Sequence, residues 1–112
     1  MHGIDDKIRV AVDDCRECSY ADVLIRNGNL VVYIMKSLFD SDKEIHELFM
    51  DYDLGDESPN GKAILLTLLE QNICPKRVQL ITMNPVGETN MENTLKDFGY
   101  IKSGGYWVKE SN

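Results

Sequence analysis

Acidic side chains fall in two short clusters of this chain, and each cluster directly follows an apolar segment. Asp13 and Asp14 form the first cluster, and Asp51 and Asp53 belong to the second. Carboxylates held at the ends of neighbouring strands repel one another unless a cation neutralises them. Hard oxygen ligands of this kind suit magnesium or manganese. The two clusters therefore predict a divalent-cation site with Asp13, Asp14 and Asp51 as its ligands.

A third polar segment, 82–87, also follows an apolar run. Thr82 and Asn84 in this segment are neutral donors that could hold a phosphoryl oxygen, and Arg16 could form a charge-assisted pair with the same group. In an open α/β sheet, ligands bind at the carboxyl ends of the parallel strands. Turn geometry is the alternative explanation for any single residue, because Asp and Asn are also common in turns for backbone reasons alone.

The elements that would position these side chains are strands alternating with helices. Short apolar, β-branched runs predict strands at 8–12, 21–25, 48–52 and 78–81. Ser58 and Pro59 are suited to begin a helix that extends to about Asn72, and a further helix ends at Gly99. Alternation of this kind predicts a single α/β domain over residues 1–112, a three-layer sandwich with a mainly parallel sheet.

Residues 27–38 are open to two interpretations. Asn27-Gly28-Asn29 could be a hairpin turn, with a return strand over 30–35, and the β-branched residues favour it. The apolar residues Val31, Ile34, Met35 and Leu38 also share one helical face. We favour the helix, because two parallel strands need a crossover between them.

The last residues predict a hairpin or edge strand, with 100–102 and 106–108 flanking Ser103-Gly104-Gly105. Tyr100, Tyr106 and Trp107 in this segment could either form a homodimer contact or cover the edge of the core. We favour the core.

Composition excludes several classes of function. The chain is 43% hydrophobic and 28% charged, as is typical of a globular protein, and no apolar run approaches the roughly 20 residues of a membrane span. The net charge of -7 argues against broad binding of nucleic-acid backbones, but not against binding a single nucleotide. No signal peptide is evident, so we expect a cytoplasmic protein with no membrane contact.

The three cysteines are Cys15, Cys18 and Cys74. An odd number does not suit a disulfide scaffold, and a zinc site lacks a fourth ligand at suitable spacing. We expect free thiols.

Three strings resemble the motifs of the cyclic-phosphate-processing receiver-like family. They are Val-Asp-Asp-Cys-Arg at 12–16, Met-Asp-Tyr-Asp-Leu-Gly at 50–55 and Thr-Met-Asn-Pro-Val-Gly at 82–87. The resemblance extends from about residue 8 to residue 99. It implies a divergent, flavodoxin-like receiver fold that acts on cyclic phosphates of nucleotides or RNA ends. It also implies an association with RNA repair and with conflict between bacteria and their viruses.

Two residues depart from the family pattern. Tyr52 stands where the family usually has His between two aspartates, and a phenol moves protons poorly near neutral pH. His2 and His46 lie outside the motifs. Lys102 lies roughly where receivers carry a required lysine, but no motif aligns it.

The resemblance and the residues together leave three hypotheses. In the first, an enzyme hydrolyses a cyclic phosphate, with Asp51, Asp53 and Arg16 in catalysis and Tyr52, Thr82, Asn84 and Gly87 contacting the substrate. In the second, the same edge binds or sequesters a cyclic nucleotide messenger, with Tyr52 stacking on its base or capping the pocket. In the third, a degenerate receiver is phosphorylated on Asp51.

Overall fold

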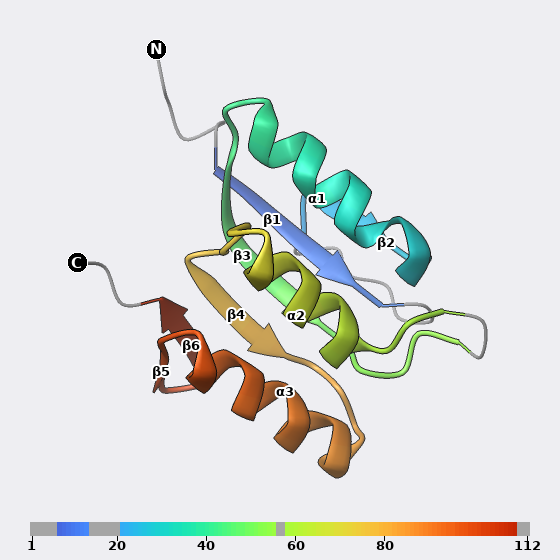
Figure 1. The fold of residues 1–112 in the computed structure, drawn as a ribbon, viewed down its shortest axis with the longest axis vertical. Helices are drawn as coiled ribbons and strands as arrows, with labels where there is room; N and C mark the ends of the chain where they lie inside the picture. The colour runs from blue at the N-terminus through green and yellow to red at the C-terminus, as the bar shows by residue number, and fades with distance from the viewer. Residues whose placement is uncertain (1–6, 14–20, 56–57, 110–112) are drawn as a thin grey trace.

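Six strands form one sheet in the computed structural model, which describes residues 7–13, 21–55 and 58–109 (Figure 1). The strand order across the sheet is β2-β1-β3-β4-β6-β5. The strands are β1 (Lys7–Val12), β2 (Val23–Ile25), β3 (Glu44–Met50), β4 (Arg77–Leu80), β5 (Tyr100–Ser103) and β6 (Tyr106–Lys109).

The sheet is mainly parallel, as predicted. Strand β1 pairs in parallel with β2 and β3, and β3 pairs in parallel with β4. Strand β6 is antiparallel to both of its neighbours, β4 and β5. Strand β5 therefore runs in the same direction as β4, and β6 is the one antiparallel strand of the described sheet. The receiver-like α/β fold expected from the sequence is confirmed.

Three helices cover one face of this sheet: α1 (Val31–Asp40), α2 (Gly61–Glu70) and α3 (Pro85–Asp97). Figure 1 shows them side by side in front of the strands. Each connects parallel strands in the same direction across the sheet, and right-handed crossovers then place all three on the same side. The described residues thus form two layers, where the sequence predicts three.

The main core lies between these helices and the sheet. Alternate sheet residues face the helices, as the two-residue period of a strand requires. The most deeply buried members are Val10, Val12, Leu48, Met50 and Val78 from the sheet, and Val31, Met35, Ile64, Leu65, Leu68, Met91 and Leu95 from the helices. Ala11 and Phe49 point to the opposite face and form a second, small apolar cluster.

Residues 28–40 are helical, so the hairpin alternative is wrong. The side chain of Asn27 accepts a hydrogen bond from the backbone N–H of Asn29 at 2.9 Å and caps a short 3-10 turn, η2 (Gly28–Leu30). Helix α1 follows this turn and buries Val31 and Met35. Burial of this apolar face outweighs the weak helix propensity of the β-branched residues.

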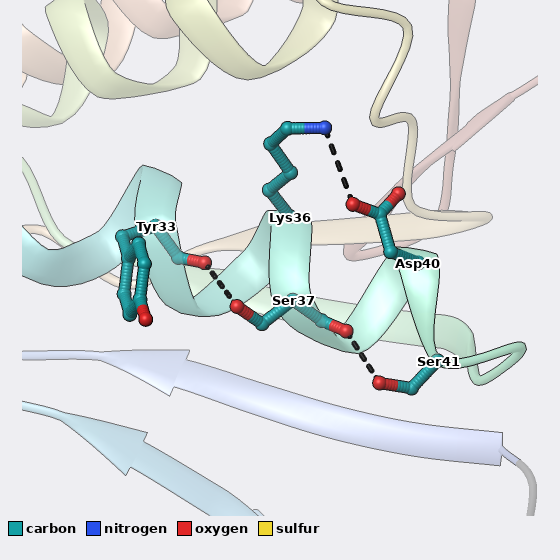
Figure 2. Close-up of polar contacts among 5 residues, drawn as sticks. All are labelled: Tyr33, Lys36, Ser37, Asp40 and Ser41. Carbon is teal, nitrogen blue, oxygen red and sulfur yellow. Dashed lines mark hydrogen bonds and ion pairs between the residues drawn. The ribbon is translucent and has the colours of Figure 1, made fainter.

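The outer face of α1 is held by local polar contacts (Figure 2). Lys36 Nζ lies 3.2 Å from the carboxylate of Asp40, an i,i+4 ion pair. The hydroxyl of Ser37 donates to the Tyr33 carbonyl at 3.0 Å, and that of Ser41 donates to the Ser37 carbonyl at 2.6 Å. These exposed contacts add little stability.

Helix α2 begins at Gly61, so the start predicted from Ser58 and Pro59 is wrong. Asn60 is the N-cap, and its side-chain oxygen accepts from the backbone N–H of Ala63 at 2.9 Å. Strand β3 also begins earlier than predicted, at Glu44. The prediction missed its first half because polar residues there alternate with the buried Ile45, so the segment is not a continuous apolar run.

The aromatic residues at the end of the chain cover the core. Tyr100 is 3% exposed and Trp107 is 5% exposed, and both belong to the main apolar cluster. Tyr106 is half-buried, with the guanidinium of Arg77 3.7 Å from its ring centroid. Cys74 is a free thiol, as expected, whereas Cys15 and Cys18 lie outside the described residues. In the described part of the chain, no helix is long and apolar enough to cross a membrane.

Candidate functional site

The ends of three parallel strands lie together at one edge of the sheet. The register pairs Val12 with Met50 and Met50 with Leu80. Past these pairs, the backbone N–H of Asp51 donates to the Val12 carbonyl at 3.0 Å, and that of Ile81 donates to the Met50 carbonyl at 3.0 Å. The carboxyl ends of β1, β3 and β4, with the first residue after each, therefore lie together at one edge of the sheet.

Asp13 and Asp51 are the first residues after β1 and β3 at this edge. Asp13 is 2% exposed, and its backbone N–H donates to the Ile25 carbonyl at 3.2 Å. Asp51 is half-buried, and its Oδ1 accepts from the backbone N–H of Tyr52 at 2.7 Å. Burial of a carboxylate is unfavourable unless hydrogen bonds or a cation compensate its charge.

The chemistry of these donors fits a magnesium or manganese ion, because both metals prefer carboxylate oxygens. Asp13 and Asp51 supply two of the predicted ligands from adjacent strand ends. Asp14, the predicted third ligand, lies outside the described residues, as does Arg16. Over residues 7–13, 21–55 and 58–109, no three His, Cys, Asp or Glu side chains are gathered as a metal site would require.

Tyr52 lies between the first turns of α2 and α3. A Cβ atom at Gly87 would overlap the Tyr52 ring, falling 2.5 Å from Cδ2 and 2.7 Å from Cδ1. The phenol oxygen accepts from Asn60 Nδ2 at 3.3 Å, and the backbone carbonyl accepts from the N–H of Gly61 at 2.8 Å. The structure thus brings together Tyr52 and Gly87, two residues that the sequence predicts at the site.

Asn84 is the N-cap of α3 and links two other predicted residues. Its Oδ1 accepts from the backbone N–H groups of Val86 and Gly87, each at 3.1 Å, which is the usual N-cap arrangement. Its Nδ2 donates to the exposed Asp53 carboxylate at 3.3 Å. Its backbone N–H donates to Thr82 Oγ1 at 3.1 Å, and the Thr82 hydroxyl keeps a proton of its own to donate.

Sequence reasoning missed Asn60 and Gly61. Asn60 both caps α2 and binds the Tyr52 hydroxyl. A Cβ atom at Gly61 would overlap the Asp51 carbonyl oxygen and lie 2.9 Å from both Tyr52 Cα and Met91 Sδ. The signal in the sequence was the Asn-Gly pair just before the apolar stripe of α2, since Asn is a preferred N-cap.

Lys102 does not supply a lysine to this edge. It lies on strand β5, which β6 separates from β4. Its Nζ is 3.7 Å from the Glu92 carboxylate on α3, and it lies 5.9 Å from the Trp107 ring centroid.

Tyr100 and Cys74, which lie away from this edge, have raised pKa values. Burial raises the pKa of the Tyr100 hydroxyl well above its ordinary value, and the nearby Cys74 raises it further. Burial also raises the pKa of the Cys74 thiol, which Lys109 partly opposes.

Comparison with known proteins identifies a family that this chain matches. A family model described as a cyclic-phosphate processing receiver domain matches residues 8–97, a range that includes all three sequence motifs. Neither the search of curated proteins nor the search of solved structures gives a match.

Proposed function

Since the chain belongs to the cyclic-phosphate processing receiver family, we propose that it hydrolyses a cyclic phosphate on a nucleotide or an RNA end, aided by a divalent cation. The observation that best supports this proposal is the position of Asp13 and Asp51, directly after paired strands at one edge of the sheet. That edge is where open α/β sheets bind ligands.

Asp13, Asp14 and Asp51 would hold the cation. When bound, magnesium or manganese polarises a phosphodiester and offsets its negative charge. The buried position of Asp13 supports this assignment, because a neighbouring cation stabilises a buried carboxylate.

The chain's own groups would position the substrate and move the proton. Asp53 is exposed, and Asn84 fixes one of its oxygens, so the carboxylate can take a proton from an attacking water. The water oxygen bonds to phosphorus, the bond from phosphorus to one ring oxygen breaks, and that oxygen takes a proton from solvent. Thr82 and Arg16 would donate to the phosphoryl oxygens as charge develops.

Binding without turnover is the second candidate, and the contacts of Tyr52 favour it. Tyr52 replaces the family's usual His, its ring packs on Gly87, and its hydroxyl is bound by Asn60. No imidazole is present at this position to move a proton near neutral pH. The protein would then sequester a cyclic nucleotide and leave it intact. Phosphorylation of Asp51 has less support, because Lys102 pairs with Glu92 away from this edge.

Mass spectrometry distinguishes hydrolysis from binding without turnover. The protein is incubated with cyclic mono- and dinucleotides and an RNA ending in a 2′,3′-cyclic phosphate, with magnesium or manganese, and is then denatured. We expect a linear product from the wild type and from Asp97→Asn, a control at an exposed acidic residue of α3, and none from Asp51→Asn. Intact ligand recovered one-for-one with protein would replace hydrolysis with sequestration.

A further inference from the structure

Tyr52 contacts two helices at once, through its ring and through its hydroxyl. We propose that Tyr52 is a positioning residue, which fixes the loop bearing Asp51 and Asp53 against α2 and α3 without touching the substrate. This role differs from the stacking on a nucleobase that the sequence suggests, and it rests on the proposed function because the loop it fixes is that of the candidate site.

The first support is the close approach of the ring to Gly87. A Cβ atom there would overlap the ring, at 2.5 Å from Cδ2. Glycine is often required for a positive φ, but in the described part of the chain the glycines with positive φ are Gly55, Gly99 and Gly104. Gly87 has helical geometry within α3, so it is the space taken by Tyr52 that excludes a side chain.

The second support is the contact between the hydroxyl and Asn60. Asn60 accepts from Ala63 through Oδ1 and donates to the Tyr52 hydroxyl through Nδ2, so the N-cap of α2 also holds the end of the phenol. The backbone carbonyl of Tyr52 accepts from Gly61 at 2.8 Å in the same turn. Tyr52 is thereby tied to the start of α2 by its backbone and by its side chain.

The third support is the link from Tyr52 to both carboxylates. On one side, its backbone N–H donates to Asp51 Oδ1 at 2.7 Å. On the other, its ring packs on Gly87, whose N–H donates to Asn84, and Asn84 donates to Asp53. Displacement of the ring would therefore move Asp51 and Asp53 relative to each other, and small displacements of catalytic groups reduce rates strongly.

The kinetic test compares two substrates with the same reacting group. Uridine 2′,3′-cyclic phosphate carries a base, and glycerol 1,2-cyclic phosphate does not. We expect Tyr52→Ala and Gly87→Ala to lower kcat by the same factor on both substrates, on the order of 10- to 100-fold. Tyr52→Phe should lower kcat less than Tyr52→Ala and should keep the wild-type pH profile, because its ring still fills the space although the contact with Asn60 is lost. Tyr33→Ala, at a 73% exposed tyrosine of α1, is the control.

A thermal-unfolding cycle tests the contact itself. Gly87→Ala should lower the Tm by roughly 5–10 °C when Tyr52 is present, because the added methyl group overlaps the ring. The same substitution made together with Tyr52→Ala should give no further decrease. The amide resonances of Asp51 and Asp53 should shift in Gly87→Ala and not in Gly105→Ala, since nothing lies within 4 Å of a Cβ atom at Gly105.

Three results would overturn the proposal. A loss confined to the uridine substrate would mean that the ring contacts the base, and an altered pH profile in Tyr52→Phe would mean that the phenol transfers a proton. If Gly87→Ala lowers the Tm by the same amount with and without Tyr52, the Tyr52 ring does not pack on Gly87. If the wild type hydrolyses neither substrate, the proposed function fails, while the Tm cycle and the amide shifts still decide whether Tyr52 fixes the loop.

Discussion

The side chain of Asn84 makes two kinds of contact. Its amide oxygen caps α3, and its amide nitrogen donates to Asp53. The oxygen and the nitrogen of the amide are chemically different, so substitutions can remove one contact and keep the other. A carboxylate can replace the capping oxygen, but it cannot donate to another carboxylate.

Asn84→Asp should therefore keep the cap of α3 but lose the hydrogen bond to Asp53. We expect the Tm to stay near that of the wild type, while turnover or ligand affinity falls because two carboxylates now face each other. Asn84→Ala should lose the cap as well, at a cost of about 1 kcal/mol in the free energy of unfolding. Urea denaturation and the mass-spectrometric assay measure the two effects. Equal loss of stability in both variants would contradict the separation.

Among the secondary-structure elements, the beginnings of α2 and α3 lie beside the end of β3. Gly61 is the first residue of α2, and a Cβ atom there would overlap the carbonyl oxygen of Asp51. The beginning of α2 thus lies directly against the loop after β3, and only glycine leaves room for that approach.

Gly61→Ala should destabilise the protein by about 1–3 kcal/mol, because the backbone of the Asp51 loop must shift to make room. The change is measured as the free energy of unfolding in urea. Gly105→Ala is the matched control, since a Cβ atom there meets nothing within 4 Å, and it should change stability little. A Gly61→Ala variant with the wild-type free energy of unfolding would show that α2 does not lie so close to the loop.

Strand β5 carries a buried phenol whose titration reports on folding. The Tyr100 hydroxyl donates to the Pro75 carbonyl at 2.5 Å, and burial raises its pKa. Its pKa in the unfolded chain is about 10, so above that pH the unfolded state loses a proton that the folded state retains. Stability should be unaffected by Tyr100 below pH 10, and it should fall above it by about 1.4 kcal/mol per pH unit.

Denaturation in urea at a series of alkaline pH values tests this slope. Tyr100→Phe should be less stable at neutral pH, because the Pro75 carbonyl loses its donor, but should lose less stability as the pH rises. Tyr33→Phe, at an exposed tyrosine, should retain the wild-type slope. An unchanged slope in Tyr100→Phe would contradict the assignment.

Much of the element order follows from the sequence, because the strands are short apolar runs and the helices have apolar faces. The position of the carboxylates also follows, since Asp13 and Asp51 come directly after such runs. The contact between Tyr52 and Gly87 could not be predicted, because 35 positions separate the two residues and only tertiary packing brings them together. The start of α2 was misplaced because Ser58-Pro59 and Asn60-Gly61 are both reasonable helix starts.

The whole molecule departs from an all-parallel receiver sheet in one respect. Strand β6 turns back from β5 and pairs with β4, with Arg77 opposite Val108 and Val78 opposite Trp107. The sequence predicts a hairpin here but not that its second strand lies between β4 and β5, because the order of strands in a sheet depends on pairing between distant segments. One consequence is that Lys102 lies two strands from β4 and pairs with Glu92.

The fold thus brings together the carboxyl ends of β1, β3 and β4, with Asp13 and Asp51 directly after the first two and with α2 and α3 beginning beside them. Helix N-termini favour negative charge, so this arrangement suits an anionic phosphate once the carboxylates are balanced by a cation. We propose that these elements together open a cyclic phosphate.

Phosphorus NMR of uridine 2′,3′-cyclic phosphate mixed with the protein and magnesium tests whether this reaction occurs. We predict that the cyclic-ester resonance is replaced by that of a monoester with the wild type and with Asp97→Asn. We predict no conversion with Asp51→Asn, or when a chelator removes the metal. Conversion at the wild-type rate by Asp51→Asn would contradict the proposed reaction, as would a cyclic-ester resonance that persists when magnesium is present and the wild-type protein is folded.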